Sequence, residues 1–325
     1  MTAELVLRNA VAAAVMAPSS HNTQPWRFKI AGRYLELHAD ARRQMLVIDR
    51  DCRQLVESCG CALMNARIAI RAMGYDDEPT VRLSGHDLPL HLASVRLGRP
   101  RDVTEHDRQL VRAIGWRRTN RRSFLTRPVA ENITSMFAMA AQREGAALVR
   151  LDPAQKAALA TLVEEADQRQ LASKRFRDDL TRWLAPAGSR RRDGIPFEEK
   201  EYGSRRAFAL SRTMRSPMLG DLFATLEESL VRTAPAVVVL GTTSDTPAAW
   251  LACGQALQAV LLHATMYGLA AAFLNQVLEV PDLRTRVANL VPGIGYPQMI
   301  LRIGVPSEPI ERVAPRRDLD AVLDD

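Results

Sequence analysis

Lysine is nearly missing from this 325-residue sequence, although the chain carries a net charge of +7. Only four of its 44 basic residues are lysines, and the rest are arginines. A preference for arginine suits bidentate contacts with phosphates or carboxylates, so the composition favours an anionic ligand. A basic excess also suits nucleic acids. The sequence has no helix-turn-helix, zinc finger or aromatic-basic platform, however, and we expect no nucleic-acid partner.

Paired cysteines and long apolar runs are missing as well. The four cysteines, at positions 52, 59, 61 and 253, form no CxxC pair and have no set of histidines near them. We therefore expect reduced, mostly buried thiols and no metal site. No run of eighteen apolar residues occurs, which argues against a membrane-spanning helix. The first sixteen residues read as an Ala/Val-rich helix rather than a cleavable leader, so we expect a cytoplasmic protein without a membrane partner.

A repeated segment predicts two related halves. Cys59-Gly60-Cys61-Ala62-Leu63 returns 194 residues later as Cys253-Gly254-Gln255-Ala256-Leu257. Each copy leads to a strand-like segment that ends in arginine, an aliphatic residue, glycine, any residue and proline, at 96–100 and 302–306. Coincidence is the alternative, because alanine and leucine are abundant. The shared order favours a duplication, in which the two halves pack about a pseudo-two-fold axis.

The repeat also sets the predicted boundaries. We expect a first half at residues 1–103 and a second at 104–325, the latter with an insertion at about 155–233. Apolar spacing of the helical kind occurs at 4–16, 51–73, 104–115, 130–142, 154–183, 218–232 and 247–267. Short strands are predicted at 26–30, 34–38, 90–97, 147–151, 236–241, 271–274 and 298–303. The pattern is that of an α+β protein.

Residues 17–26, Ala-Pro-Ser-Ser-His-Asn-Thr-Gln-Pro-Trp, form a polar loop between a predicted helix and a predicted strand. Hydroxyls, amides and rigid prolines supply donors and acceptors without much net charge, which suits the edge of a polar heterocycle. The alternative is a turn that merely joins two elements. The candidate ligand-binding residues of this polar loop are Pro18, Ser19, Ser20, Asn22 and Gln24.

Two basic segments could hold a phosphate. Residues 116–124, Trp-Arg-Arg-Thr-Asn-Arg-Arg-Ser-Phe, place four arginines beside hydroxyl and amide side chains, and we call them the arginine segment. Guanidinium groups form charge-assisted, bidentate bonds to phosphates. A solvated basic turn is the alternative. Near the end of the chain, Arg316 and Arg317 follow the last predicted strand, and by composition they belong simply to a charged tail.

Together these three segments resemble the FMN-dependent nitroreductase family, and most closely its Acg-like, single-chain branch of mycobacteria and other actinobacteria. In that family the Pro-Ser-Ser-x-Asn loop comes from one subunit of a homodimer, and the phosphate-side arginines with a late basic motif come from the other. The resemblance implies two tandem nitroreductase-like halves that mimic the homodimer, with a helical lid insertion in the second. The residues it assigns to FMN are Pro18, Ser19, Ser20, Asn22, Gln24, Arg117, Arg118, Thr119, Arg121, Arg316 and Arg317.

One complete FMN site per chain follows from this division of motifs. The first half has only Arg8 where an arginine motif should precede the loop, and the second half has 140–145, Ala-Ala-Gln-Arg-Glu-Gly, in place of the loop. Residues 273–276, Phe-Leu-Asn-Gln, stand where relatives place backbone groups near the flavin, and they depart from the Glu-Gly pattern of those relatives. Arg302 is a further candidate for the phosphate. We expect a monomer with an internal pseudo-two-fold axis.

Two functions fit this pattern. In the first, FMN takes hydride from NADPH or NADH and reduces a nitro or quinone acceptor, so no catalytic side chain is required. In the second, the chain sequesters or stores FMN behind a closed lid with little or no reductase activity. The insertion supports a lid, because it mixes arginine clusters with glycine, proline and the aromatic residues Trp183, Phe197, Tyr202 and Phe208. The alternative to a lid is an external helical hairpin that stabilises the second half. Of the two functions, we place the oxidoreductase first.

Overall fold

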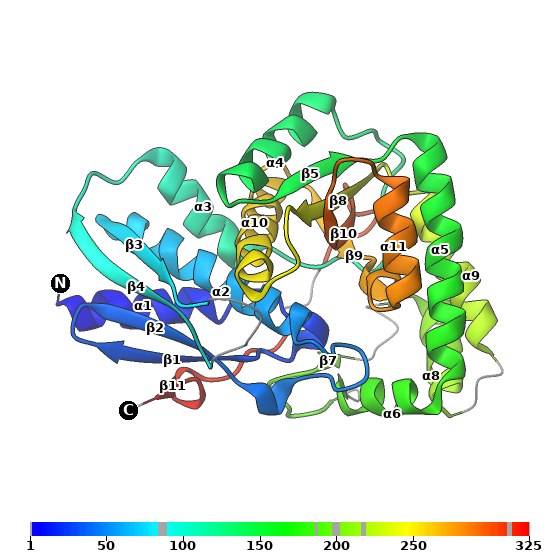
Figure 1. The fold of residues 1–325 in the computed structure, drawn as a ribbon, viewed down its shortest axis with the longest axis horizontal. Coiled ribbons are helices and arrows are strands. Elements are labelled where there is room, and N and C mark those ends of the chain that lie inside the picture. The colour runs from blue at the N-terminus through cyan, green and yellow to red at the C-terminus, as the bar shows by residue number, and fades with distance from the viewer. Residues whose placement is uncertain are drawn as a thin grey trace.

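The computed structural model describes residues 2–83, 90–185, 188–196, 202–215, 219–310 and 314–324 (Figure 1). Two long helices, α2 (Arg53–Ala72) and α10 (Pro247–Met266), lie side by side at the centre, with one sheet on each side of the pair (Figure 1). Helices and strands are mixed along the chain, and the predicted α+β class is confirmed.

The first half builds a five-stranded sheet against α2. Its elements in chain order are α1 (Ala3–Ala14), β1 (Trp26–Ala31), β2 (Tyr34–Ala39), α2, β3 (Tyr75–Val81) and β4 (His91–Pro100). The strand order is β11-β1-β2-β4-β3, in which β11 (Leu323–Asp324) is the end of the chain and runs parallel to β1. The C-terminal tail, residues 314–324, therefore crosses back to the first half.

The second half repeats this arrangement around α10. Its elements are α3 (Glu105–Trp116), α4 (Glu131–Arg143), β5 (Ala147–Arg150), β8 (Ala236–Thr242), α10, β9 (Ala270–Phe273), α11 (Pro281–Leu290) and β10 (Tyr296–Gly304). The strand order is β5-β8-β10-β9, all antiparallel. In both sheets the strand after the central helix takes the edge, and the next strand inserts beside it. The two sheets thus share one topology.

A largely helical insertion separates β5 from β8. It consists of α5 (Pro153–Ala172), α6 (Lys174–Arg182), β6 (Leu184–Ala185), β7 (Ile195–Pro196), α8 (Ser204–Arg215) and α9 (Gly220–Arg232). Leu171, Phe176, Leu180 and other apolar side chains of the insertion form a cluster with Met45 and Ile48 of the first half. The insertion therefore reaches across the molecule and packs on the opposite half, as the position of α6 and β7 in Figure 1 shows. Phe197 lies outside the described residues.

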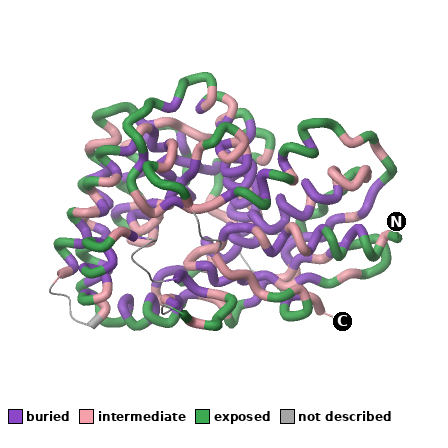
Figure 2. The backbone as a smooth tube through the Cα atoms, turned by 180° about the vertical axis from the view of Figure 1, so that it is seen from behind, coloured by how far each residue is buried: buried purple, intermediate pink, exposed green. Residues whose placement is uncertain are grey.

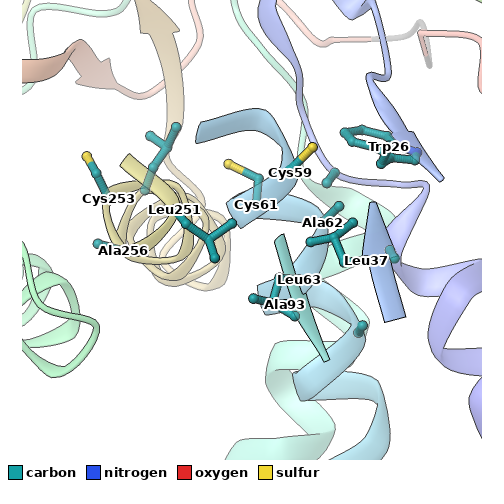
Figure 3. Packing of buried hydrophobic residues seen from close by; sticks show 14 of the residues in the cluster. Trp26, Leu37, Cys59, Cys61, Ala62, Leu63, Ala93, Leu251, Cys253 and Ala256 are labelled. Atoms are coloured by element: carbon teal, nitrogen blue, oxygen red, sulfur yellow. The ribbon is translucent and has the colours of Figure 1, made fainter. Parts of the chain in front are cut away.

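The two central helices cross at the repeated glycines. A Cβ atom on Gly60 would lie 2.3 Å from the carbonyl oxygen of Leu251, and one on Gly254 would lie 2.0 Å from the carbonyl oxygen of Glu57. Leu251 precedes Gly254 by three residues, as Glu57 precedes Gly60, so each helix presents the same surface to the other. Such reciprocity is the property of a two-fold interface. Figure 3 shows the side chains of both helices around this crossing.

The sheet of the second half is covered on both faces, and the sheet of the first half on one. Val238 and Leu240 of β8 join the main core with the central helices, whereas Val237 and Val239 join a second core with α5 and α11. All seven residues of β8 are buried. Strand β2 instead alternates, with alternate residues buried and outward-facing. Figure 2 shows the backbone coloured by burial, with buried segments gathered in the interior and exposed ones at the periphery.

The structure corrects some predicted elements. The predicted helix at 154–183 is wrong as one unit, because Ser173 adopts an extended ψ of 118° and its hydroxyl caps a new helix at Phe176 N. Strand β3 was not predicted, because its sequence is charged and contains Pro79, which an edge strand tolerates. Helices α8 and α11 were not predicted either. The seven predicted strands are all present.

The cysteines are free thiols that lie mostly in the interior. All four cysteines are free, and Cys59, Cys61 and Cys253 are buried, as predicted. Burial raises the pKa of Cys52 to about 11, so this thiol is protonated at neutral pH. Within the described ranges, no helix is both long and apolar enough to cross a membrane.

Candidate functional site

A cavity of about 270 Å³ lies between the two halves and the insertion. Small-molecule sites commonly have volumes of roughly 300–1,000 Å³, so this cavity has the scale of a compact ligand site. Its wall combines the polar loop, the central helices, the arginine segment, the insertion, the region of β9 and β10, and the tail. The predicted residues that line it are Pro18, Ser19, Ser20, Asn22, Arg117, Arg118, Thr119, Arg121 and Arg316.

The polar loop has a strained and well-supported backbone. His21, Asn22 and Gln24 have φ angles of 48°, 55° and 51°, in the left-handed region that residues other than glycine rarely adopt. Each such residue costs on the order of 1 kcal/mol or more unless its surroundings fix it. Here the Ser19 hydroxyl accepts a hydrogen bond from Gln24 N at 2.9 Å, and the Ser58 hydroxyl of α2 accepts one from Ser20 N at 3.1 Å. The loop is thus held in shape by α2 and by its own side chains.

The arginine segment runs along the edge of the second sheet. Thr119 forms a parallel bridge with Ala271, and Asn120 N donates to Ala271 O at 2.9 Å. Buried Arg302 of β10 donates to the carbonyl oxygens of Arg122 at 2.7 Å and Arg121 at 3.0 Å. Arg302, a candidate phosphate ligand by sequence, therefore lines the cavity while it supports this backbone.

The burial of Arg117 is the strongest indication that the cavity binds an anion. Only 6% of it is exposed, and in the described part of the chain no side chain or carbonyl forms a hydrogen bond or ion pair with its guanidinium, whose Nε is buried without a partner. Burial lowers the pKa of Arg117 to about 10, and the charges of Arg118 and Arg121 add to that effect. A buried cation without a counterion is costly. This arrangement is favourable only if an anion enters the cavity.

Arg316 brings a third guanidinium from the tail to the same place. Its Nη1 donates to the Asn22 Oδ1 at 3.0 Å, and its Nη2 donates to the Met16 carbonyl at 3.3 Å. Burial lowers the pKa of Arg316 to about 9, and the charges of Arg117 and Arg118 lower it further. The three guanidinium groups repel one another, so an anion with two negative charges would stabilise the whole cluster.

Gln24 and Arg317, two of the predicted ligand-binding residues, do not line the cavity. The Gln24 Oε1 accepts a hydrogen bond from Arg317 N at 2.8 Å, and the Arg317 Nη1 donates to the Gln24 carbonyl at 3.3 Å. The Gln24 Nε2 donates to the carbonyl of Arg192 in the insertion at 2.7 Å. In this structure both residues join loop, tail and insertion, because the backbone turns their side chains away from the cavity.

A set of contacts joins the polar loop and Arg43 to residues 192–194 of the insertion, and we call it the clasp. The Asn22 Nδ2 donates to Gly194 O at 3.0 Å, and Gly194 N donates back to Asn22 O at 3.2 Å. Arg43, just after β2, pairs with Asp193. Gly194 has φ +79°, and a Cβ there would lie 2.8 Å from the Trp183 carbonyl oxygen. The amide of Asn22 is thereby fully engaged in the clasp and the tail.

The wall of the cavity also includes acidic and polar residues that the sequence did not reveal. Glu279 accepts hydrogen bonds from the amides of Gln54 and Gln170, each at 2.8 Å. Asp167 accepts one from Gln276 at 3.3 Å, and burial raises the pKa of Asp167 to about 7. These residues are scattered over α2, α5 and the segment before α11. No local motif identifies them.

His21 is a further residue that the sequence did not single out. Burial lowers its pKa to about 4, and the nearby charge of Arg121 acts in the same direction. The ring is therefore neutral at physiological pH, and its Nδ1 lies 3.1 Å from the Ser20 hydroxyl. The insertion completes the wall with Phe176, Leu180, Leu184, Ile195, Pro196, Tyr202, Leu210 and Phe223. The cavity thus has a cationic end, a polar loop and an apolar cover.

The chain has close relatives along its whole length. A Mycobacterium tuberculosis H37Rv protein named "Putative NAD(P)H nitroreductase Rv3131" is 31% identical over 98% of this chain and 91% of its own length. The chain belongs to the nitroreductase family. The resemblance to the Acg-like branch is confirmed too, since "Putative NAD(P)H nitroreductase acg" of the same organism is 29% identical over 98% of this nitroreductase and 95% of its own chain.

Other comparisons are less informative about this nitroreductase. "Uncharacterized protein Rv3127" of M. tuberculosis is 30% identical over 98% of the chain and 92% of its own length. Among solved structures, the FMN-dependent nitroreductase NfnB of Mycobacterium smegmatis, in complex with NADPH, is 20% identical, with a TM-score of 0.44 over 67% of this chain and 97% of its own. No protein-family profile matches the sequence.

Proposed function

We propose that this protein binds one FMN in the cavity between its halves and uses it for NAD(P)H-dependent reduction of nitro or quinone acceptors. The observation that carries the proposal is the buried guanidinium of Arg117 beside Arg118 and Arg316, since its Nε has no hydrogen-bond partner among the residues that the structure describes. A flavin phosphate supplies the two negative charges that this cluster lacks. The names of the full-length relatives support the same activity.

The chain's own residues then divide the work of binding. Arg117, Arg118 and Arg316 hold the phosphate, while Ser19, Ser20 and Thr119 offer hydroxyls to the polar edges of the cofactor. The apolar cover excludes water from the reacting face. FMN supplies the hydride transfer when bound, with NADPH or NADH as the source of electrons. No side chain of this protein is therefore assigned as a catalytic acid, base or nucleophile.

We further propose that the chain arose by tandem duplication and acts as a monomer with one flavin. The shared topology of the two sheets and the reciprocal crossing at Gly60 and Gly254 support halves at 1–103 and 104–325. We propose no second flavin site, because residues 140–145 form the end of α4 and a turn at Gly145, where a second site would need a polar loop. Four free thiols suit the reducing cytoplasm, where we place the protein.

Comparison of FMN with riboflavin tests the phosphate assignment, because the two ligands differ only by that group. Arg117→Ala should weaken FMN binding by about tenfold or more, the value of one charge-assisted hydrogen bond, and should leave riboflavin affinity unchanged. Quenching of flavin fluorescence measures both affinities. Arg112→Ala is the matched control, since Arg112 is an exposed arginine on α3 outside the cavity. Equal affinities of wild type and Arg117→Ala for FMN would refute the assignment.

Sequestration of FMN is the second candidate function, and the clasp favours it. Asn22, Gln24 and Arg43 hold the insertion over the cavity in this structure, where it would block a nicotinamide. Anaerobic stopped-flow mixing of the flavin-loaded protein with NADPH separates the two functions. Rapid bleaching that a quinone or nitroaromatic reverses supports the reductase. A protein that keeps its FMN and does not bleach is a storage protein.

A variant of the clasp shows whether the insertion controls access to the flavin. Asp193→Ala removes the ion pair with Arg43. If the insertion gates the cavity, this change speeds both the bleaching by NADPH and the exchange of FMN. Arg169→Ala is the control, because it removes another ion pair of the insertion, with Asp282, that lies outside the clasp. Equal acceleration in both variants would contradict the gating role.

A further inference from the structure

The outward face of the first sheet carries a cluster of three metal-binding side chains. Glu36 and His38 lie two residues apart on β2, so both point to the same face of the sheet. His91 begins β4 and pairs directly with His38 in the strand register. A register shift between Leu37 and His38 marks a β-bulge, a feature that redirects side chains. Two rigid strands therefore position all three groups.

The geometry of the cluster suits a small ion. One ligand atom from each residue lies within 4.8 Å of the other two. The Nε2 of His38 and the Oε2 of Glu36 are 3.1 Å apart. Two ligands at 2.0–2.1 Å from a tetrahedral zinc ion are separated by about 3.3 Å, so these two atoms already have the required spacing. The two imidazole rings lie 4.6 Å apart, at an angle of 20°.

The hydrogen bonding of His91 is suitable as well. Its Nε2 lies 3.1 Å from the Ala93 carbonyl oxygen. A proton on this nitrogen satisfies the carbonyl and leaves Nδ1 with a free lone pair. Metal-bound histidines commonly donate their second N–H to such a carbonyl.

Nearby charges limit the affinity without removing the site. Glu36 contributes one negative charge, which favours a metal cation at the cluster. Arg82 acts electrostatically on His91, and Lys29 stands opposite Glu36 on β1. These cations compete with a divalent ion for the carboxylate, so we expect moderate affinity. About a quarter of the Glu36 and His38 side chains is exposed, which provides an entry path and room for a water ligand.

We propose that Glu36, His38 and His91 bind one Zn²⁺ ion, with water completing its coordination shell. The ion would link β2 to β4 on the sheet face that no insertion covers, and it would stabilise the first half through its binding energy. This site is separate from the cavity, so the proposal of a zinc site does not depend on the proposed binding of FMN. The sequence pattern Glu36-x-His38 was visible, but the partnership with His91 depends on the strand register.

Titration of the full-length protein with ZnCl₂ tests the site. Calorimetry should show one saturable equivalent, and Co²⁺ should give the visible absorption of a bound ion. His38→Ala and His91→Ala should each weaken binding by at least about tenfold, and Glu36→Gln by a similar factor, because every ligand contributes directly.

A matched control comes from the second histidine pair of the protein. His106 and His263 lie 5.5 Å apart, and within the described residues they belong to no three-ligand cluster. His106→Ala should leave the zinc titration unchanged. Circular dichroism confirms folding of each variant, and His91→Gln replaces His91→Ala if that variant is unfolded. Unchanged zinc affinity in His38→Ala and in the folded His91 variant, or the absence of saturable binding in the wild type, would overturn the proposal.

Discussion

The two sheets of this nitroreductase share a topology but differ in what covers them. Strand β2 alternates, with Leu35 and Leu37 buried and their neighbours turned outward, whereas β8 is buried over its whole length. In an antiparallel sheet with one face exposed to solvent, apolar and polar residues alternate along each strand. In a sheet that is covered on both faces, the strands are continuous apolar runs. Helix α5 of the insertion and α11, which follows β9, make this difference, because both pack on the outer face of the second sheet. One half thus supplies a rigid polar loop, and the other supplies a cover.

The crossing of the central helices allows the sharpest test of how equivalent the halves are. Gly254→Ala places a methyl group 2.0 Å from a backbone oxygen of α2, and Gly60→Ala does the same at 2.3 Å from α10. Each change should cost at least about 4 kcal/mol, because backbone on both sides blocks relaxation. Urea denaturation measures the loss. Gly115→Ala is the control, since its added Cβ meets no atom within 4 Å. A mild effect in one glycine and a severe effect in the other would break the symmetry.

A pH-dependent test contrasts the insertion with the first half. The folded-state pKa of Asp167 is raised to about 7 by burial, above its ordinary value of about 3.9. This group therefore favours the folded state fully below about pH 4, and its contribution is lost as the pH rises toward 7. Asp167→Asn should stabilise the protein at pH 8 by on the order of 3 kcal/mol and have little effect at pH 4.

His21 of the polar loop should behave in the opposite sense. Its folded-state pKa of about 4 lies below the ordinary value of 6.5, so its favourable contribution is present above pH 6.5 and is lost as the pH falls to 4. Urea denaturation from pH 4 to 8 measures both trends. The same stabilisation by Asp167→Asn at every pH would contradict the assignment of the raised pKa.

The covering of the two sheets should be visible in truncations of single side chains. Val239→Ala removes contacts between β8 and the insertion and should cost about 2 kcal/mol. Tyr34→Ala acts on an outward position of β2 that is 45% exposed, and it should cost less than about 1 kcal/mol. Thermal unfolding of both variants gives the comparison. Equal losses would show that the outer face of the first sheet is covered in solution as well.

The clasp should give the smallest effect. Asn22→Ala removes the side-chain hydrogen bonds to Gly194, Pro315 and Arg316, of which only the one to Gly194 holds residues 192–196, and a typical hydrogen bond contributes about 1 kcal/mol. We expect roughly fivefold faster hydrogen exchange at residues 192–196 and no change in β8. Uniform acceleration over the whole chain would instead indicate global destabilisation.

Local patterns predicted most of the architecture. The regular spacing of apolar residues placed the seven strands, and the repeated glycine segment located the helices that cross at the centre. The prediction of one helix at 154–183 missed the break at Ser173, because one serine does not outweigh the helical spacing of apolar residues on either side. Strand β3 was missed because its register with β4, rather than its composition, makes it a strand.

The candidate site was predictable where its residues cluster in sequence. The polar loop and the arginine segment were found because each concentrates unusual residues within ten positions. Gln24 and Arg317 belong to these motifs, yet the backbone directs them into the connections between loop and tail. Asp167 and Glu279 reach the cavity only through the packing of α5 and the segment before α11. Contacts between distant elements are not encoded in any local pattern.

The final strand has a consequence for how the cavity can open. Phe28 N donates to the Val322 carbonyl at 2.7 Å, and β11 runs beside β1, so the chain begins and ends in the same half. The polypeptide thereby closes into a loop in which the second half is tied to the first at both of its ends. Two bodies joined twice cannot swing apart about a single hinge. Ligand entry therefore depends on movement of the insertion, whose two chain ends join β5 and β8 of the second half and which contacts the first half through the clasp.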